Sequence, residues 1–262
     1  MQKKRSALMA VLAVVLVAAL TAGGTLAYMT DSESLTNTFI VGDLDVTIDE
    51  PNYPDGECNE RVPGDSFPKD PTITAVKGDS YMRVKVEFLD GNGSSGKVIT
   101  DAERLALIMQ TLYFDPNFSA TVVNGYKGSD NLRVWAGTAN SHPPDATYHY
   151  TQAQLAALVS SGKVDSWYNE TNFDTPASGG NGSYFLNYKG IFHQGATVKV
   201  FTSVVYPSDW NQVQLKKLGS YAIRLTVQSI QAAGFGTDRA AAYAKLDSET
   251  ILENYGVTSP RT

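Results

Sequence analysis

Cysteine and histidine are scarce in this chain. Of its 262 residues one is cysteine, Cys58, and three are histidine. A single cysteine excludes an internal disulfide and any zinc or iron–sulfur site held by several cysteines. No His-Glu-x-x-His pattern is present, so the helix-borne zinc site of many metallopeptidases is absent from the sequence. We therefore predict no catalytic residues and no cofactor.

Basic clusters are also lacking beyond the N-terminus. The chain has 21 Lys+Arg against 27 Asp+Glu, and its only basic block is Lys3-Lys4-Arg5. Binding to nucleic-acid phosphates needs clustered Lys and Arg, so we expect no nucleic-acid partner. The 42% hydrophobic and 18% charged residues fit neither a disordered chain nor a multi-span membrane protein.

The N-terminus has the three parts of a secretory signal peptide. The basic block precedes an apolar run over residues 7–22, which is followed by Thr25-Leu26-Ala27 with small residues at positions −3 and −1. The run is shorter than the roughly 20 residues that span a bilayer, although an uncleaved anchor helix is the alternative. We predict cleavage between Ala27 and Tyr28, membrane contact only during export, and a secreted protein.

Alternating apolar and polar residues predict a mostly β fold. The pattern begins at Thr38 and slips by one residue at Gly42-Asp43, as a bulge would cause. In residues 81–88 the even positions should face a core and Arg83, Lys85 and Glu87 should face solvent. Further strands are expected over 38–48, 196–205 and 221–227, and shorter ones over 120–123, 131–135, 147–150 and 183–188.

Helices are expected only on connections. Thr100 with Glu103, and Thr151 with Gln154, form capping-box patterns before apolar runs. Residues 240–246 and 248–254 also have helical patterns, whereas 49–71 should be loop. Together, these strand and helix patterns predict a jelly-roll-like antiparallel β-sandwich over residues 38–262, with an elaborated insertion at about 90–195. Residues 1–27 form the signal peptide and residues 28–37 a polar N-terminal arm.

Several motifs resemble the TasA/camelysin family. They are the segment 23–31, Asn37-Thr38-Phe39, the segment 42–45, Pro63-Gly64-Asp65 and Lys69-Asp70-Pro71. The resemblance covers roughly residues 1–90 and 196–236, and Met29 stands where the family usually has phenylalanine. It implies an exported jelly-roll protein at the cell surface or in a biofilm matrix, where it assembles into extracellular fibres. The implied partners are a SipW-type signal peptidase, further copies of the chain and other matrix proteins.

The resemblance also implies a connector between copies, because in that family a freed N-terminal segment completes the sheet of the next subunit. Here the donor-strand candidates are Tyr28, Met29, Thr30, Asp31 and Leu35, of which Met29 and Leu35 share one parity and could fill pockets of an acceptor. A head-to-tail contact of this kind does not close on itself, so it propagates as a filament.

Two other functions compete with a fibre subunit. Camelysin is described as a metallopeptidase, and His142, Asp145 and His149 lie close enough in sequence to supply metal ligands. A carbohydrate-binding adhesin would use aromatic residues that could equally be core: Trp135, Trp167, Trp210, Tyr184, Phe185 and Tyr188.

An acidic stretch and the cysteine leave smaller questions open. Residues 43–60 contain seven carboxylates, which could bind calcium or form a solvated loop: Asp43, Asp45, Asp49, Glu50, Asp55, Glu57 and Glu60. Cys58 could pair with a second copy or stay a free thiol.

Overall fold

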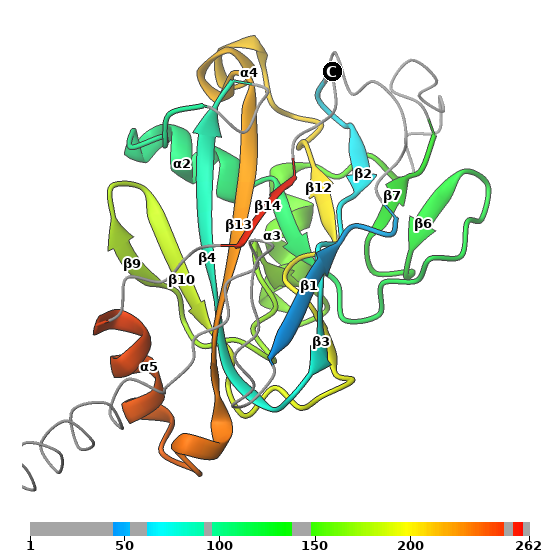
Figure 1. Cartoon of the computed structure of the whole chain (residues 1–262). Coiled ribbons are helices and arrows are strands. Elements are labelled where there is room, and N and C mark those ends of the chain that lie inside the picture. Colours follow the sequence, from blue (N-terminus) through cyan, green and yellow to red (C-terminus); the bar gives the residue numbers. More distant parts are fainter. Residues whose placement is uncertain (1–43, 53–61, 92–95, 138–147, 249–253, 259–262) are drawn as a thin grey trace, which may run out of the picture.

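The computed structural model describes residues 44–52, 62–91, 96–137 and 148–248, and the backbone of 254–258. Its largest element is a five-stranded antiparallel sheet in the order β14-β13-β4-β10-β9 (Figure 1). The strands are β4 (Ser80–Asp90), β9 (Ala177–Gly180), β10 (Ser183–Asn187), β13 (Tyr221–Gln231) and β14 (Asn254–Thr258). We call it the main sheet.

Two smaller antiparallel sheets provide further strands of the sandwich. One has the order β1-β3-β11, with β1 at Asp45–Asp49, β3 at Thr72–Lys77 and β11 at Thr197–Lys199. The other has the order β2-β12-β5-β8, with β2 at Ser66–Pro68, β12 at Ser203–Val205, β5 at Leu112–Phe114 and β8 at Asp165–Ser166. A separate hairpin pairs β6 (Tyr126–Gly128) with β7 (Arg133–Trp135). The predicted mostly β, sandwich-type fold is confirmed.

The core follows the predicted alternation. Met82, Val84, Val86 and Phe88 of β4 are fully buried, as expected. β4 pairs with β13, whose Ile223, Leu225 and Val227 belong to the same hydrophobic cluster. Residues from all three sheets contribute to this cluster.

The other face of β4 is not open to solvent, and that part of the prediction is wrong. Arg83 and Glu87 are each only 6% exposed. Glu87 accepts a hydrogen bond from Arg224 Nε at 2.8 Å and lies 3.2 Å from Lys85 Nζ, so opposite charges pair across the strands. Helix α5 (Arg239–Ser248) packs near Arg83 and encloses that end of the face.

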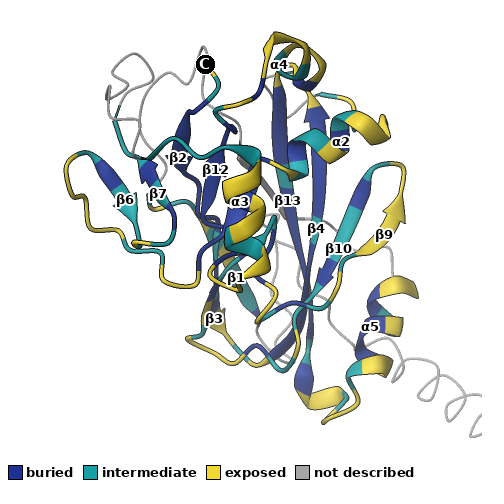
Figure 2. Cartoon of the chain, turned by 180° about the vertical axis from the view of Figure 1, so that it is seen from behind, coloured by how far each residue is buried: buried dark blue, intermediate teal, exposed yellow. Residues whose placement is uncertain are grey.

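Four α-helices lie among the described residues, and they sit on connections as predicted. They are α2 (Ala102–Met109), α3 (Gln152–Ser160), α4 (Gln212–Leu218) and α5. Figure 2 shows exposed residues on each. The capping box of Thr151 and Gln154 is confirmed. That of Thr100 and Glu103 is wrong, because Asp101 caps α2 by accepting from Arg104 N at 2.7 Å.

The long strand expected over 196–205 is split. β11 belongs to one small sheet and β12 to the other, so the chain crosses between sheets at residues 200–202. The loop expected over 49–71 contains β2, which the proline-rich flanks concealed. The elements that were not predicted also include β3, β5, β6, β8, β9 and α4.

Other local expectations fail at turns. Residues 120–123 form no strand, because Asn124 and Gly125 adopt positive φ and fold Val123 back against Tyr126. Residues 148–150 are likewise not a strand, and 147 lies outside the described residues. Of the helix expected over 248–254, Ser248 is the last residue of α5 and 249–253 lie outside the described residues. At Asn254 the expectation is wrong, because that residue opens β14.

The predicted bulge at Gly42-Asp43 lies outside the described residues. A register shift occurs nearby, between Asp45 and Val46 of β1. No helix within the described ranges is long and apolar enough to cross a membrane.

Candidate functional site

The candidate metal ligands are not brought together where the structure describes them. His142 and Asp145 lie outside the described residues. His149 lies beside Gly64, where a Cβ atom would stand 2.9 Å from the imidazole Nδ1. Within the described residues no three His, Cys, Asp or Glu side chains form a group that could hold a metal ion. His193 pairs with Asp79 at 2.9 Å on an exposed turn.

The described part of the acidic stretch is used for packing. Asp43, Asp55, Glu57, Cys58 and Glu60 lie outside the described residues. Glu50, just after β1, turns back onto Lys69, with Oε2 at 3.1 Å from Nζ. Lys69 is 3% exposed, so this ion pair is largely withdrawn from water. Glu50 is therefore part of the fold's interior and is not a ligand on a solvated loop.

Lys69 belongs to a buried polar network where the two small sheets meet. Asp70 is fully buried and accepts from the Asn52 backbone N–H at 3.1 Å, from Asn52 Nδ2 at 2.8 Å and from Lys199 Nζ. Lys127 Nζ in turn donates to Asn52 Oδ1 at 3.3 Å. We call Glu50, Asn52, Lys69, Asp70 and Lys199 the junction network. It joins β1, the 69–71 segment and β11.

The junction network predicts a pH dependence. Burial raises the pKa of Glu50 above its ordinary value of 4.5, although Lys69 opposes the shift. A raised folded-state pKa stabilises the fold below about pH 4.5, and this contribution is lost as the pH rises through the folded pKa. We therefore expect the Glu50→Gln variant to lose less unfolding free energy than the parent between pH 5 and 7, measured by urea denaturation. Equal pH slopes in the two proteins would contradict this assignment.

The aromatic residues proposed for carbohydrate stacking pack against one another or against the core. Trp167 contacts the rings of Tyr184 and Phe88 at centroid distances of 5.6 and 6.5 Å. Trp210 is 6% exposed and donates from Nε1 to Gln152, and Tyr188 packs on Phe192. Trp167 and Tyr184 retain partial exposure at one rim of the sandwich, and we call this pair the aromatic rim.

The sheets end in edge strands whose unpaired backbone groups could accept another strand. β1 has Asp45 and Asp49 at its ends, β8 has Asp165 and β11 has Lys199. β2 ends in Pro68. β9 differs, because its sequence Ala-Ser-Gly-Gly has neither charge nor proline and all four residues are exposed. Sequence reasoning missed β9, since glycine and serine there indicate a loop; only the register with β10 reveals a strand.

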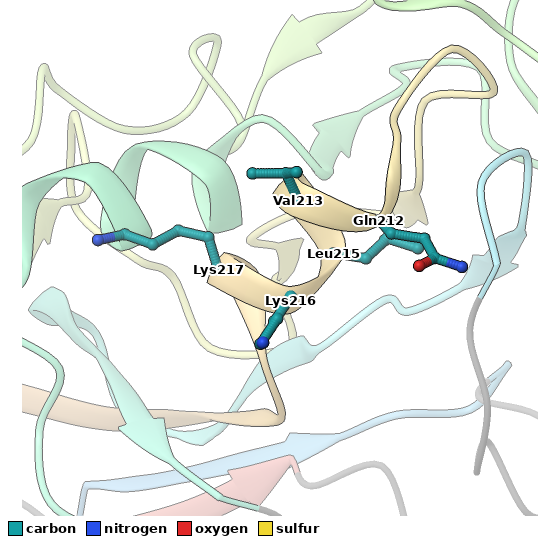
Figure 3. A pocket seen from close by; sticks show the side chains of 5 residues that line it. All are labelled: Gln212, Val213, Leu215, Lys216 and Lys217. Atoms are coloured by element: carbon teal, nitrogen blue, oxygen red, sulfur yellow. The ribbon is translucent and has the colours of Figure 1, made fainter.

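A hollow beside α4 is formed by diverging side chains. In Figure 3, Val213, Lys216 and Lys217 point in different directions from the helix. Val213 is 75% exposed, and Lys217 lies 3.3 Å from Asp101 and 3.2 Å from Glu103. The side chains do not converge on a common point, so this surface has no arrangement for chemistry.

The arm and cleavage residues, which are Ala27, Tyr28, Met29, Thr30, Asp31 and Leu35, lie outside the described residues. Cleavage at Ala27 and strand donation by the arm therefore stay predictions. The described residues from 44 onward supply the strands, the hydrophobic clusters and the candidate acceptor edges.

Comparison with protein families gives a match at the N-terminal end of the chain. Residues 2–78 match a family model described as camelysin metallo-endopeptidase. No protein with a curated description matches the chain. The matched segment ends just after β3 and contains no histidine, since the three histidines are at positions 142, 149 and 193. The resemblance carried by the N-terminal motifs is confirmed over residues 2–78, where this chain is similar to the camelysin family.

Proposed function

We propose that this protein is an exported structural subunit that assembles head-to-tail into extracellular fibres. After signal-peptide cleavage, residues 28–37 would pair with an edge strand of the next copy. The observation that supports this most is the set of antiparallel sheets with edge strands, joined to a chain whose main hydrophobic cluster runs from Phe67 to Val227. In this proposal the arm adds to the sheet of a neighbour, whose described strands already share a hydrophobic cluster.

The sequence of the arm suits backbone pairing. It is mostly polar, and strand addition gains its affinity from main-chain hydrogen bonds with little demand on side-chain identity. The two apolar residues Met29 and Leu35 share a parity, so they would face the same side of the extended sheet. Each copy then carries one donor and one acceptor, and such a contact continues without closing.

Removing the arm tests the proposal. We expect the mature chain from Tyr28 to form filaments visible by electron microscopy, and the chain from Thr38 to sediment as a monomer. Both should unfold at a similar temperature, because the described strands begin at Asp45. Filaments of normal diameter from the shortened chain would rule out the arm as connector.

A metallopeptidase is the second candidate, and the family description favours it. Its metal site would need histidines from outside the matched segment, namely those at 142 and 149 together with Asp145. Zinc content near one per chain, with chelator-sensitive cleavage of casein that His149→Ala abolishes, would establish this function. A fibre subunit should show neither, and its assembly should be unaffected by His142→Ala and His149→Ala.

A further inference from the structure

Both nitrogen atoms of Asn52 are held by one carboxylate of the junction network. The Asn52 backbone N–H donates to Asp70 Oδ1 at 3.1 Å, and its side-chain Nδ2 donates to Asp70 Oδ2 at 2.8 Å. Asp70 is fully buried and does not follow solvent. The two bonds therefore hold the Asn52 carboxamide in one orientation, with its oxygen Oδ1 directed away from Asp70.

A lysine amine lies at that oxygen. Lys127, on β6, places Nζ 3.3 Å from Asn52 Oδ1. Lys69 and Lys199 each face a carboxylate, whereas Lys127 forms no ion pair with any residue that the structure describes. Because Oδ1 is bonded to Cγ, the Lys127 amine lies beside the carbon atom that a nucleophile attacks.

We propose that Lys127 and Asn52 form an intramolecular isopeptide bond, with Asp70 as the catalytic residue that transfers the proton. The inference is independent of the proposed function. An amine and an amide that the fold holds side by side react as one molecule, which replaces a very high concentration of free reactant. A buried carboxylate on the leaving nitrogen supplies the acid–base catalysis that amide exchange needs.

The reaction balances without a co-reactant. Lys127 releases its ammonium proton to water, and the neutral Nζ bonds to Cγ of Asn52 while the C=O electron pair moves onto Oδ1. Nζ and Nδ2 are then bonded to the same carbon, so the Asp70 carboxylate that accepts from Nδ2 also reaches Nζ. It takes the extra proton from Nζ and gives it to Nδ2. The Cγ–Nδ2 bond breaks, the C=O bond re-forms and ammonia leaves.

The position of the bond gives it a structural role. β6 belongs to a hairpin of three residue pairs, and a two-stranded hairpin alone is marginally stable. β7 is attached to β2, where Trp135 N donates to Ser66 Oγ at 3.1 Å. A bond from Lys127 would attach β6 to the end of β1, 75 positions away in sequence. Such a cross-link restricts the unfolded chain as a disulfide does, and one cysteine cannot form an internal disulfide.

Mass spectrometry of the purified mature chain tests the bond. We expect an intact mass one ammonia below that of the sequence. Trypsin should release a branched peptide that joins the segment ending at Arg61 to residues 105–133, uncut after Lys127. Lys127→Arg should have the full mass of its sequence, because a guanidinium keeps the charge but does not attack an amide. Lys163→Arg, at an exposed lysine, is the matched control and should lose ammonia as the parent does.

Two further comparisons separate this bond from other reactions. A succinimide at Asn52 also releases one ammonia, but the backbone nitrogen forms it, so that loss would persist in Lys127→Arg. Asp70→Asn keeps the side-chain size and removes the proton transfer, so ammonia loss should become at least tenfold slower. An unchanged rate would exclude Asp70 from the reaction.

The decisive variant is Lys127→Arg, which also decides if Asp70→Asn does not fold. The full sequence mass in the parent, with trypsin cleavage after Lys127, would overturn the proposal. So would ammonia loss that survives Lys127→Arg. Neither result depends on whether the chain forms filaments, so the proposed function is tested separately.

Discussion

Replacing Asp70 by alanine should lower the free energy of unfolding by about 3–5 kcal/mol, the range measured when one partner of a buried ion pair is removed. Asp70 is fully buried and holds Lys199 and both nitrogen donors of Asn52. Without the carboxylate, a lysine and an amide are left without their acceptor at the junction of two sheets. Urea denaturation monitored by circular dichroism gives the value.

Asp130→Ala is the matched control for this prediction. Asp130 also pairs with a cation, Arg133, at 2.8 Å, but its side chain is 94% exposed. An exposed pair of this kind contributes about 0–1 kcal/mol, because water screens it. Similar losses in the two variants would show that the junction network does not depend on burial. A loss below about 1 kcal/mol at Asp70 would show that β1 and β11 are held by their ladders alone.

Replacing Arg83 by methionine should cost about 3 kcal/mol and should loosen α5 from the main sheet. The guanidinium donates to Gln228, to Asp247 and to the Leu246 carbonyl oxygen, and it lies 4.5 Å from the centre of the Phe185 ring. Methionine keeps most of the side-chain volume, so the loss reports on polar contacts. Two of those contacts are with α5 itself.

Hydrogen exchange checks where the effect lies. In Arg83→Met, amides of α5 should exchange faster by a larger factor than those of β4 and β13. The control is Arg133→Met on β7, which removes an exposed ion pair and an aromatic contact far from α5 in sequence and should leave α5 protection unchanged. Uniform loss of protection across the main sheet would mean that Arg83 stabilises the whole fold and does not specifically attach the helix.

The long strands could be predicted from sequence because one physical signal determines them. β4 and the first part of β13 alternate between apolar and polar residues, and the apolar residues of the alternation lie in the hydrophobic cluster. The charged face of β4 was wrongly predicted to face solvent, for a different reason. Alternation indicates which residues face the hydrophobic core. It does not indicate that the other face is enclosed by cross-strand ion pairs and by α5, whose Asp247 lies 164 residues after Arg83.

The edge strand β9 could not be predicted in the same way. Glycine and serine at 178–180 indicate flexibility in any single-sequence reading, and only pairing with β10 makes them a strand. The junction network is similar, since Glu50 and Lys69 are far apart in sequence and each alone resembles a surface charge. The N-terminal motif was the informative part for function, because its short spacing needs no tertiary structure to be read.

If the protein assembles into fibres as proposed, the position of α5 has a mechanical consequence. Ser80 pairs with Gln231 at one end of the main ladder, so the N-terminal side of β4 and the C-terminal side of β13 leave from the same end. Tension applied to these two chain ends would break the hydrogen-bonded residue pairs between β4 and β13 one after another. A pair of strands resists this direction of pulling least. At that end Ala232 N donates to Asp79 O, Tyr81 OH to Gly236 O and Tyr243 OH to Met82 O. The turn that follows β13, together with α5, therefore holds the end of the strand pair at which this separation would start.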